Sequence, residues 1–279
     1  MSFTTLVSVR ELAAHLDDPH WIVFDCRHDL TDTESGRRAY AQSRVPGARF
    51  VHLDEDLSGP KTGANGRHPL PDPEQFRSRL AALGMTNGKQ AVAYDASGGY
   101  YAARLWWMLR WTGHDRIAVL DGGWDAWLKA GLPVTAQPPA IGAGKFSGAA
   151  RDNAVDARFI LTQLGQPRIR LIDARSPDRF RGENETLDPV GGHIPGAANR
   201  FFKNNLTADG CFKPPLELNR EFSALLDALP PSQVVHQCGS GVTACHNLLA
   251  MEIAGLTGSK LYPGSWSEWC SDPRRPVAR

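Results

Sequence analysis

The sequence predicts an α/β protein made of two tandem domains, each a mainly parallel sheet flanked by helices. Two observations support this prediction. Short apolar runs alternate with helical stretches along the 279 residues, which is typical of a parallel sheet covered by helices on both faces. The chain also resembles itself, because four landmarks recur in the same order roughly 145 residues apart.

The first landmark is an apolar run that ends in Asp-x-Arg, at 21–27 and again at 170–175. The other three pairs are 44–48 with 193–197, 91–99 with 234–241, and 120–127 with 262–269. Two copies at this period indicate a duplicated domain rather than a solenoid. We therefore expect one domain at 1–135 and another at 153–279, joined by a Pro-, Gly- and Ala-rich linker at 136–152.

The elements of the first copy follow from its local patterns. Ser8 is expected to cap a helix at 9–16, and an apolar strand follows at 21–25. The amphipathic stretch 73–83 predicts a helix that stops at Gly84. The remaining predicted elements are a strand at 91–94, a helix from Tyr100 to about Thr112, a strand at 117–120 and a helix at 124–130. The second copy repeats this order.

Composition excludes several classes of protein. The net charge of +1 gives no bulk attraction to nucleic acid or to a membrane surface. No apolar run approaches the ~18–20 residues that would span a bilayer, and the N-terminus lacks the pattern of a secretory signal. The five cysteines are scattered and show no C-x-x-C spacing, which predicts reduced thiols in a cytoplasm and no zinc site.

The string HQCGSGVTACH, at 236–246, carries the chemistry. It lies between a predicted strand at 234–236 and a predicted helix at about 242–254, where ligands of parallel sheets bind. Small residues let several backbone N–H groups point into one concavity, and the helix N-terminus adds partial positive charge. Both features stabilise a thiolate, so Cys238 is interpreted as an activated nucleophile. The alternative is a small buried cysteine that fills the turn.

These motifs resemble those of the rhodanese superfamily. The resemblance rests on the tandem arrangement, Asp-x-Arg, [HR]-[VI]-Pro-Gly-Ala, Cys238-Gly-Ser-Gly-Val-Thr-Ala244 and Gly-Ser-Trp-x-Glu-Trp, and covers nearly the whole chain. In particular the chain is similar to two-domain sulfurtransferases that act on thiosulfate or 3-mercaptopyruvate. In the first copy the equivalent of Cys238 is taken to be Ala96, so only the second copy is expected to be catalytic.

The resemblance implies a mechanism without a metal or a cofactor. The Cys238 thiolate takes the outer sulfur of a small-molecule donor and becomes a persulfide. A thiol, cyanide or a reduced carrier protein, with a thioredoxin-like reductant as one candidate partner, then removes that sulfur.

The identity of the donor stays open between two compounds. Thiosulfate enzymes of this family carry cationic residues just after the cysteine, whereas Gly239 and Ser240 are neutral here, which favours 3-mercaptopyruvate. The resemblance places an arginine for the donor carboxylate at Arg179, and Arg67 is a second candidate. The loop 182–192, however, lacks the further arginine that mercaptopyruvate enzymes often carry.

The rest of the cysteine loop is assigned to donor binding through Gly241, Val242 and Thr243, and Thr243 is expected to bond the loop backbone. The resemblance also implies a proton relay of Ser240, His68 and Asp54. Both His68 and Asp54 lie in the first copy, so the relay requires the two copies to face each other.

Several other residues have simpler interpretations. Arg27 and Arg175 are expected to form structural ion pairs with the strand-end aspartates. Cys245 is expected to be a core residue rather than a resolving thiol, and His236 and His246 are expected to pack.

Three other classes of function compete with a small-molecule sulfurtransferase. A cysteine phosphatase needs C-x5-R, but Ala244 stands six residues after the cysteine. A non-catalytic binding module suits the first copy better than the second. Sulfur trafficking to a protein partner stays open beside small-molecule turnover.

Overall fold

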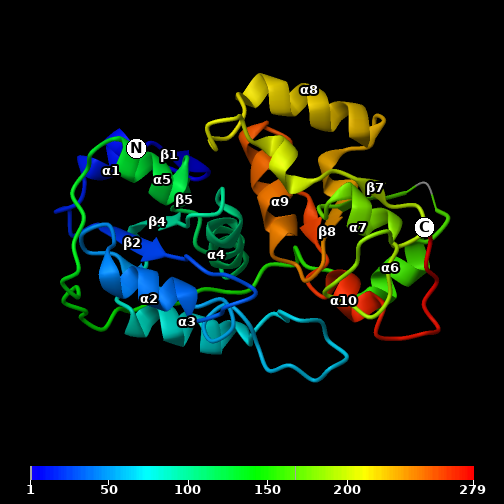
Figure 1. The fold of residues 1–279 in the computed structure, drawn as a ribbon, viewed down its shortest axis with the longest axis horizontal. Coiled ribbons are helices and arrows are strands. Elements are labelled where there is room, and N and C mark those ends of the chain that lie inside the picture. The colour runs from blue at the N-terminus through cyan, green and yellow to red at the C-terminus, as the bar shows by residue number, and fades with distance from the viewer. Residues whose placement is uncertain (1, 167) are drawn as a thin grey trace. The chain divides into compact units, whose positions relative to one another are not determined.

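The computed structural model describes residues 2–166 and 168–279, and these form two units (Figure 1). Unit 1 comprises Met1–Gly59, Pro71–Arg151 and Ala208–Cys211. Unit 2 comprises Pro60–Leu70, Asp152–Thr207 and Phe212–Arg279. Two segments therefore depart from the sequence halves. The stretch 60–70, which carries Arg67 and His68, belongs to unit 2 rather than to the first copy.

Unit 1 contains five strands and five helices among its described residues. The strands are β1 (Leu6–Val7), β2 (Trp21–Asp25), β3 (Arg49–Phe50), β4 (Gln90–Tyr94) and β5 (Ile117–Leu120). The helices are α1 (Val9–Ala13), α2 (Ser35–Gln42), α3 (Pro73–Ala82), α4 (Tyr100–Trp111) and α5 (Gly123–Lys129). Every strand pair is parallel, in the order β1-β5-β4-β2-β3.

Helices cover both faces of the unit 1 sheet, with α1 and α5 on one side and α2 and α3 on the other (Figure 1). Leu12 of α1 and Trp127 of α5 are fully buried against Val23 and Val92 of the central strands. Successive residues of a strand face opposite sides of the sheet, so Phe24 and Ala93 are buried on the opposite face. The central strands are therefore apolar on both faces, as the sequence predicts.

Unit 2 contains four strands, and its helices include two short 3₁₀ turns. The strands are β6 (Arg170–Asp173), β7 (Ala198–Asn199), β8 (Val234–Gln237) and β9 (Lys260–Leu261). The helices are α6 (Ala157–Gln163), α7 (Pro177–Arg181), η1 (Phe202–Asn205), α8 (Pro215–Leu226), η2 (Pro231–Gln233), α9 (Thr243–Ile253) and α10 (Ser265–Trp269). The strands are parallel, in the order β7-β6-β8-β9.

The core of unit 2 lies against one face of this sheet. Ile160 of α6 and Trp266 and Trp269 of α10 are buried against Leu171 and Val235. Helix α9 packs on the other face of β8, and α8 packs on α9 (Figure 1). This layering brings the C-terminal ends of β6 and β8, and the N-termini of α7 and α9, to one edge of the sheet.

The predicted strands and helices are confirmed, with small shifts in their ends. Helix α1 ends at Ala13 rather than at 16, and its start has the full capping box of Ser8 and Glu11. Helix α2 and strand β3 were not predicted. None of the helices in residues 2–166 and 168–279 is both long and apolar enough to cross a membrane.

The stretch expected to be a linker is bound along unit 1. The N–H of Gly144 donates to the Ala81 carbonyl at 2.8 Å, and the N–H of Asn87 donates to the Lys145 carbonyl at 3.1 Å. Phe146 is 9% exposed. Residues 136–151 therefore belong to the surface of unit 1 and do not form a free tether.

Candidate active site

Cys238 lies between β8 and α9, at the carboxyl edge of the unit 2 sheet, and is 2% exposed. The backbone N–H of Gly241 donates to Cys238 Sγ at 3.1 Å. Gly241 has a φ of 76°, and a Cβ there would lie 2.4 Å from the carbonyl oxygen of Pro263, so the loop requires glycine. The sulfur thus sits at the positive end of an 11-residue helix and accepts a backbone hydrogen bond. Both features stabilise negative charge on the sulfur.

The first turn of α10 fixes the other side of this loop. The N–H of Trp266 donates to the Cys238 carbonyl at 3.0 Å, and the N–H of Ser267 donates to the Gly239 carbonyl at 2.9 Å. Ser265 Oγ accepts the N–H of Cys238 at 3.1 Å. These bonds hold the first two carbonyl groups of the loop on α10. Ser265 was not predicted to be a site residue.

The structure brings together two of the three relay residues. Ser240 Oγ and His68 Nδ1 are 2.8 Å apart, and both side chains are buried within unit 2. The segment that carries His68 is fastened by its neighbour Arg67, whose N–H donates to Ser267 Oγ at 3.0 Å. The third residue, Asp54, belongs to unit 1.

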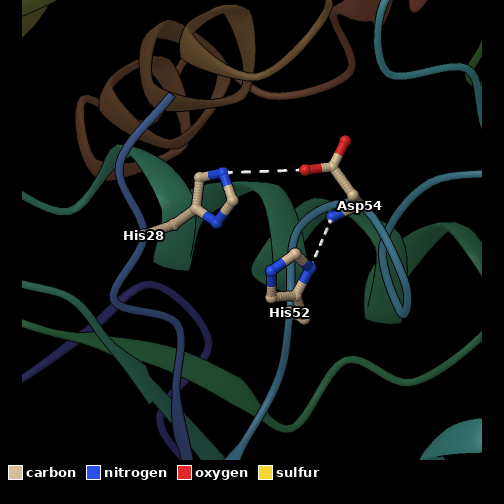
Figure 2. Close-up of side chains that lie close together, drawn as sticks. All are labelled: His28, His52 and Asp54. Atoms are coloured by element: carbon tan, nitrogen blue, oxygen red, sulfur yellow. Dashed lines mark hydrogen bonds and ion pairs between the residues drawn. The ribbon is translucent and has the colours of Figure 1, made fainter. Parts of the chain in front are cut away.

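Asp54 lies in a turn shaped by two histidines (Figure 2). His52 Nδ1 accepts the N–H groups of Asp54 and Glu55, at 3.2 and 3.3 Å, and His52 Nε2 bonds the Thr33 carbonyl at 2.9 Å. His28 Nε2 faces the Asp54 carboxylate at 3.8 Å. Burial lowers the pKa of His28, and the nearby His52 lowers it further, so this pair is not an ion pair at neutral pH.

His28, His52 and Asp54 also place one potential metal-ligand atom each within 4.8 Å of one another. Both ring nitrogens of His52 already have backbone partners, however. We therefore assign these three residues to shaping the turn that presents Asp54.

The two arginines assigned to donor binding, Arg67 and Arg179, both reach the loop that follows Cys238. A Cβ on Gly239 would lie 2.8 Å from Arg67 Nη2 and 3.5 Å from Arg179 Nη2. Arg179 projects from α7, the short helix that follows β6. The two guanidinium groups therefore cover the residue next to Cys238, and glycine at 239 makes room for them.

Two acidic residues of the loop 182–192 hold these arginines. Arg179 donates to both oxygens of Glu185, at 2.7 to 3.1 Å, and Arg67 pairs with Asp188. Both acidic side chains are 3% exposed. Burial raises the pKa of Glu185, but hydrogen bonds from Arg179 outweigh it, and this pKa lies below its ordinary value. Glu185 and Asp188 were not predicted to be site residues, although both stand in the sequence of the loop.

The Asp-x-Arg motifs form the structural ion pairs that were predicted. Arg175 Nη2 lies 2.7 Å from Asp173 Oδ2, and its guanidinium carbon lies 4.7 Å from the centre of the Trp266 ring. Arg175 also reaches Glu185 at 3.3 Å. Burial lowers the pKa of Arg175, but the charges of Asp173, Glu185 and Cys238 raise it above its ordinary value. Arg175 therefore links the sheet edge to the acidic loop.

The interpretation of Ala96 as the first-copy equivalent of Cys238 is wrong by one residue. Asp25 pairs with Tyr94 in one sheet and Asp173 pairs with Gln237 in the other, so the residue after Tyr94 corresponds to the residue after Gln237. That residue is Asp95. Its carbonyl accepts the N–H of Trp124 at 2.8 Å, as the Cys238 carbonyl accepts that of Trp266.

The Asp95 carboxylate fills the anion cradle of the first copy. It accepts four backbone N–H groups, and the donors are Ser97, Gly99, Tyr101 and Ala102 at 2.7 to 2.9 Å. Ala96 lies exposed outside this cradle. The first copy therefore has no thiol at this position, as predicted, but the residue there is Asp95 rather than Ala96.

The remaining predicted residues fall around the loop. Val242 is buried at the N-cap of α9, and Thr243, which begins the helix, is partly exposed. Cys245 is buried and donates its S–H to the Gly241 carbonyl at 3.3 Å, which is a core role. His236 and His246 are both fully buried, as the packing interpretation predicts.

Unit 2 also contains a cavity of about 650 Å³ that lies away from this loop. Its lining includes Ile160 and Gln163 of α6, Arg170 at the start of β6, and Asp227. Arg170 and Cys238 mark opposite ends of the parallel strands, so this cavity is not part of the candidate site.

Two features define the class of this protein: a duplicated parallel α/β domain, and a cysteine just before the N-terminus of a helix. The model of the rhodanese-like domain matches residues 8–130 and 157–272. The chain is a member of the rhodanese-like domain family.

Individual relatives span between 96% and 100% of the chain. It is 48% identical to a probable 3-mercaptopyruvate sulfurtransferase of Pseudomonas aeruginosa, with 100% of this chain and 99% of that protein covered. It is 36% identical to a thiosulfate sulfurtransferase of Cricetulus griseus, with 96% and 92% covered. The structure matches that of 3-mercaptopyruvate sulfurtransferase from Leishmania major with a TM-score of 0.85 and 31% identity, covering 98% of this chain and 75% of that one.

Proposed function

We propose that this protein is a sulfurtransferase that moves a sulfur atom from 3-mercaptopyruvate to an acceptor through a persulfide on Cys238. The observation that carries the proposal is the hydrogen bond from Gly241 N–H to Cys238 Sγ at the start of α9. A backbone donor and a helix N-terminus beside a sulfur are the surroundings in which cysteines act as nucleophiles. The relatives named above act in the same class of reaction by their names.

In the first half-reaction the Cys238 thiolate attacks the donor sulfur. The S–S bond forms while the C–S bond breaks, and its electron pair leaves as pyruvate enolate. The proton of the donor thiol remains on the new persulfide and must move to the enolate carbon to give pyruvate. Ser240 and His68, 2.8 Å apart, are placed to carry that proton. Asp54, which belongs to unit 1, is the third residue that the resemblance assigns to this relay.

In the second half-reaction an acceptor attacks the outer sulfur of the persulfide. The S–S bond breaks and returns the Cys238 thiolate. A thiol leaves as a persulfide, and cyanide leaves as thiocyanate. The donor carboxylate is oriented by Arg67 and Arg179, with Gly239, Gly241, Val242 and Thr243 forming the floor of the site.

Thiosulfate is the alternative donor. Its outer sulfur would form the same persulfide, and sulfite would leave with the electron pair of the broken S–S bond. The neutral Gly239 and Ser240 favour mercaptopyruvate, as does the name of the Pseudomonas aeruginosa relative, whereas the name of the Cricetulus griseus relative favours thiosulfate.

The cellular setting is part of the same proposal. All five cysteines are present as thiols rather than disulfides, a state typical of a reducing compartment, and we place the protein in the cytoplasm on that ground. A reduced thioredoxin-like protein is a suitable acceptor there.

Steady-state turnover with each donor, using cyanide or dithiothreitol as acceptor, tests this function. We expect a higher kcat/KM for mercaptopyruvate and no turnover by Cys238→Ser. Cys211→Ser, which changes a cysteine of unit 1, is the matched control and should keep wild-type turnover. Mass spectrometry after donor alone should find one extra sulfur on the peptide that contains Cys238. Turnover by Cys238→Ser would contradict the mechanism, and a higher kcat/KM for thiosulfate would reverse the donor.

A further inference from the structure

The loop 182–192 is closed tightly at its base. Gly182 has a φ of 76°, and a Cβ there would lie 2.8 Å from the N of Gly192. A Cβ on Gly191 would lie 3.0 Å from Gly182 Cα. The two ends of the loop thus touch through glycines, and the loop folds back over α7 as a compact unit.

This loop directs two carboxylates at the arginines of the site. Glu185 reaches Arg175 and Arg179, at 3.3 and 2.7 Å. Asp188 pairs with Arg67 and lies 3.5 Å from Arg179. The arginine side chains remain open to solvent on one side, with exposures of 28% for Arg67 and 19% for Arg179.

The charges in this network cancel. Three guanidinium groups, on Arg67, Arg175 and Arg179, are connected to three carboxylates, on Asp173, Glu185 and Asp188. The arginines can therefore still offer N–H donors to a donor molecule, but their net positive charge is neutralised. In the thiolate form that the proposed mechanism uses, Cys238 adds a further negative charge to the site.

We propose that Glu185 and Asp188 select the charge of the sulfur donor. By neutralising Arg67 and Arg179, they favour a donor with one negative charge and disfavour a dianion such as thiosulfate. This inference rests on the proposed function, because it deepens the donor choice of the same site. It assigns specificity to the acidic loop, and not only to the neutral residues after the nucleophile.

Coulomb energy is linear in the charge of the ligand, so a change at this loop acts twice as strongly on a dianion. Removing one carboxylate charge should therefore multiply the two values of kcat/KM unequally. If the factor for mercaptopyruvate is about three, that for thiosulfate should be about nine. The ratio between donors isolates this effect from general changes in reactivity.

Asp188→Asn is the principal variant, because asparagine keeps the size of the side chain. Glu183→Gln is its matched control. Glu183 lies on the same loop and loses the same charge, but it is exposed and pairs with Arg181, which is also exposed. Thermal unfolding of both variants checks that the fold is kept.

We expect Asp188→Asn to raise kcat/KM for thiosulfate about threefold more than for mercaptopyruvate, and Glu183→Gln to leave that ratio unchanged. High salt should reduce the difference. Equal factors for both donors, or the same shift in the control, would overturn the proposal while leaving the sulfurtransferase activity established.

A second measurement reads the charge of the site without turnover. Iodoacetate carries one negative charge and iodoacetamide carries none, and each alkylates Cys238 by forming a C–S bond as iodide leaves. Asp188→Asn should raise the ratio of the iodoacetate rate to the iodoacetamide rate about threefold, measured on the Cys238 peptide by mass spectrometry. An unchanged ratio would contradict the inference, even if neither sulfur donor were turned over.

Discussion

The backbone N–H of Cys238 donates a hydrogen bond to the side-chain oxygen of Ser265, across 3.1 Å. The same oxygen donates to the Tyr262 carbonyl at 2.9 Å, so the hydroxyl group joins the two chain segments. Ser265 has a φ of 54°, a left-handed conformation that costs a non-glycine residue free energy. The geometry of the loop after Cys238 thus depends on a strained residue outside the string 236–246, in the Gly-Ser-Trp-x-Glu-Trp motif.

Ser265→Ala should lower the free energy of unfolding by about 1–3 kcal/mol, because it leaves the buried N–H of Cys238 without a partner. Ser265→Gly loses the same oxygen but relieves the left-handed strain, so it should be more stable than Ser265→Ala by about 1 kcal/mol. Urea unfolding of both variants measures this difference. An alanine variant as stable as the wild type would show that the hydroxyl group is dispensable.

Gly239→Ala should change donor binding with little effect on stability. The new Cβ would meet the end of the Arg67 side chain at 2.8 Å, and a flexible side chain can move away. The displaced guanidinium should raise KM for mercaptopyruvate about tenfold. Gly142→Ala, at a position where a Cβ meets open space, serves as the control. A KM equal to that of the wild type would show that Arg67 does not bind the donor.

Ser240→Ala separates the two donors by their need for a proton. Pyruvate enolate must be protonated, whereas sulfite leaves thiosulfate without a proton transfer. Loss of the serine that lies 2.8 Å from His68 should lower kcat for mercaptopyruvate about a hundredfold. The kcat for thiosulfate should change much less. Equal losses with both donors would point to a structural role for the Ser240–His68 contact.

The buried His236 should make the free energy of unfolding depend on pH. Burial lowers its pKa from 6.5 to about 3 in the folded state. The unfolded chain therefore binds a proton first as pH falls, and the stability present above pH 6.5 is lost as pH falls towards 3. The loss should approach about 1.4 kcal/mol per pH unit within that window.

Denaturant unfolding at several pH values measures this slope. Leucine cannot bind a proton, so in His236→Leu the number of protons taken up on unfolding should fall by about one, and the free energy of unfolding should depend less steeply on pH. His20→Gln, which changes an exposed histidine, is the control. An unchanged slope in His236→Leu would assign the acid sensitivity to other groups.

Local patterns were enough to predict most of the fold. Apolar runs such as 91–94 and the caps at Ser8 and Gly84 mark elements by neighbouring residues alone. Helix α2 has the sequence SGRRAYAQ and only one buried residue, Gly36, so it has no apolar face to detect. Strand β3 has two residues, which is too few to show a period.

The site was predictable only where a motif carries it. Cys238 and its loop could be named from the string, but the partners of Arg67 depend on contacts across more than a hundred residues. The error at Ala96 has a similar cause. The two glycine-rich loops can be aligned in more than one way by their letters, whereas the pairing of Asp25 with Tyr94 allows only one alignment.

The carboxylate of Asp95 determines how a reactive thiol could be placed in the first copy. The cradle in the first copy is already occupied, because its four backbone N–H donors all bind the Asp95 side chain. A cysteine would have to replace Asp95 to lie in this cradle, since a cysteine at 96 would lie outside it.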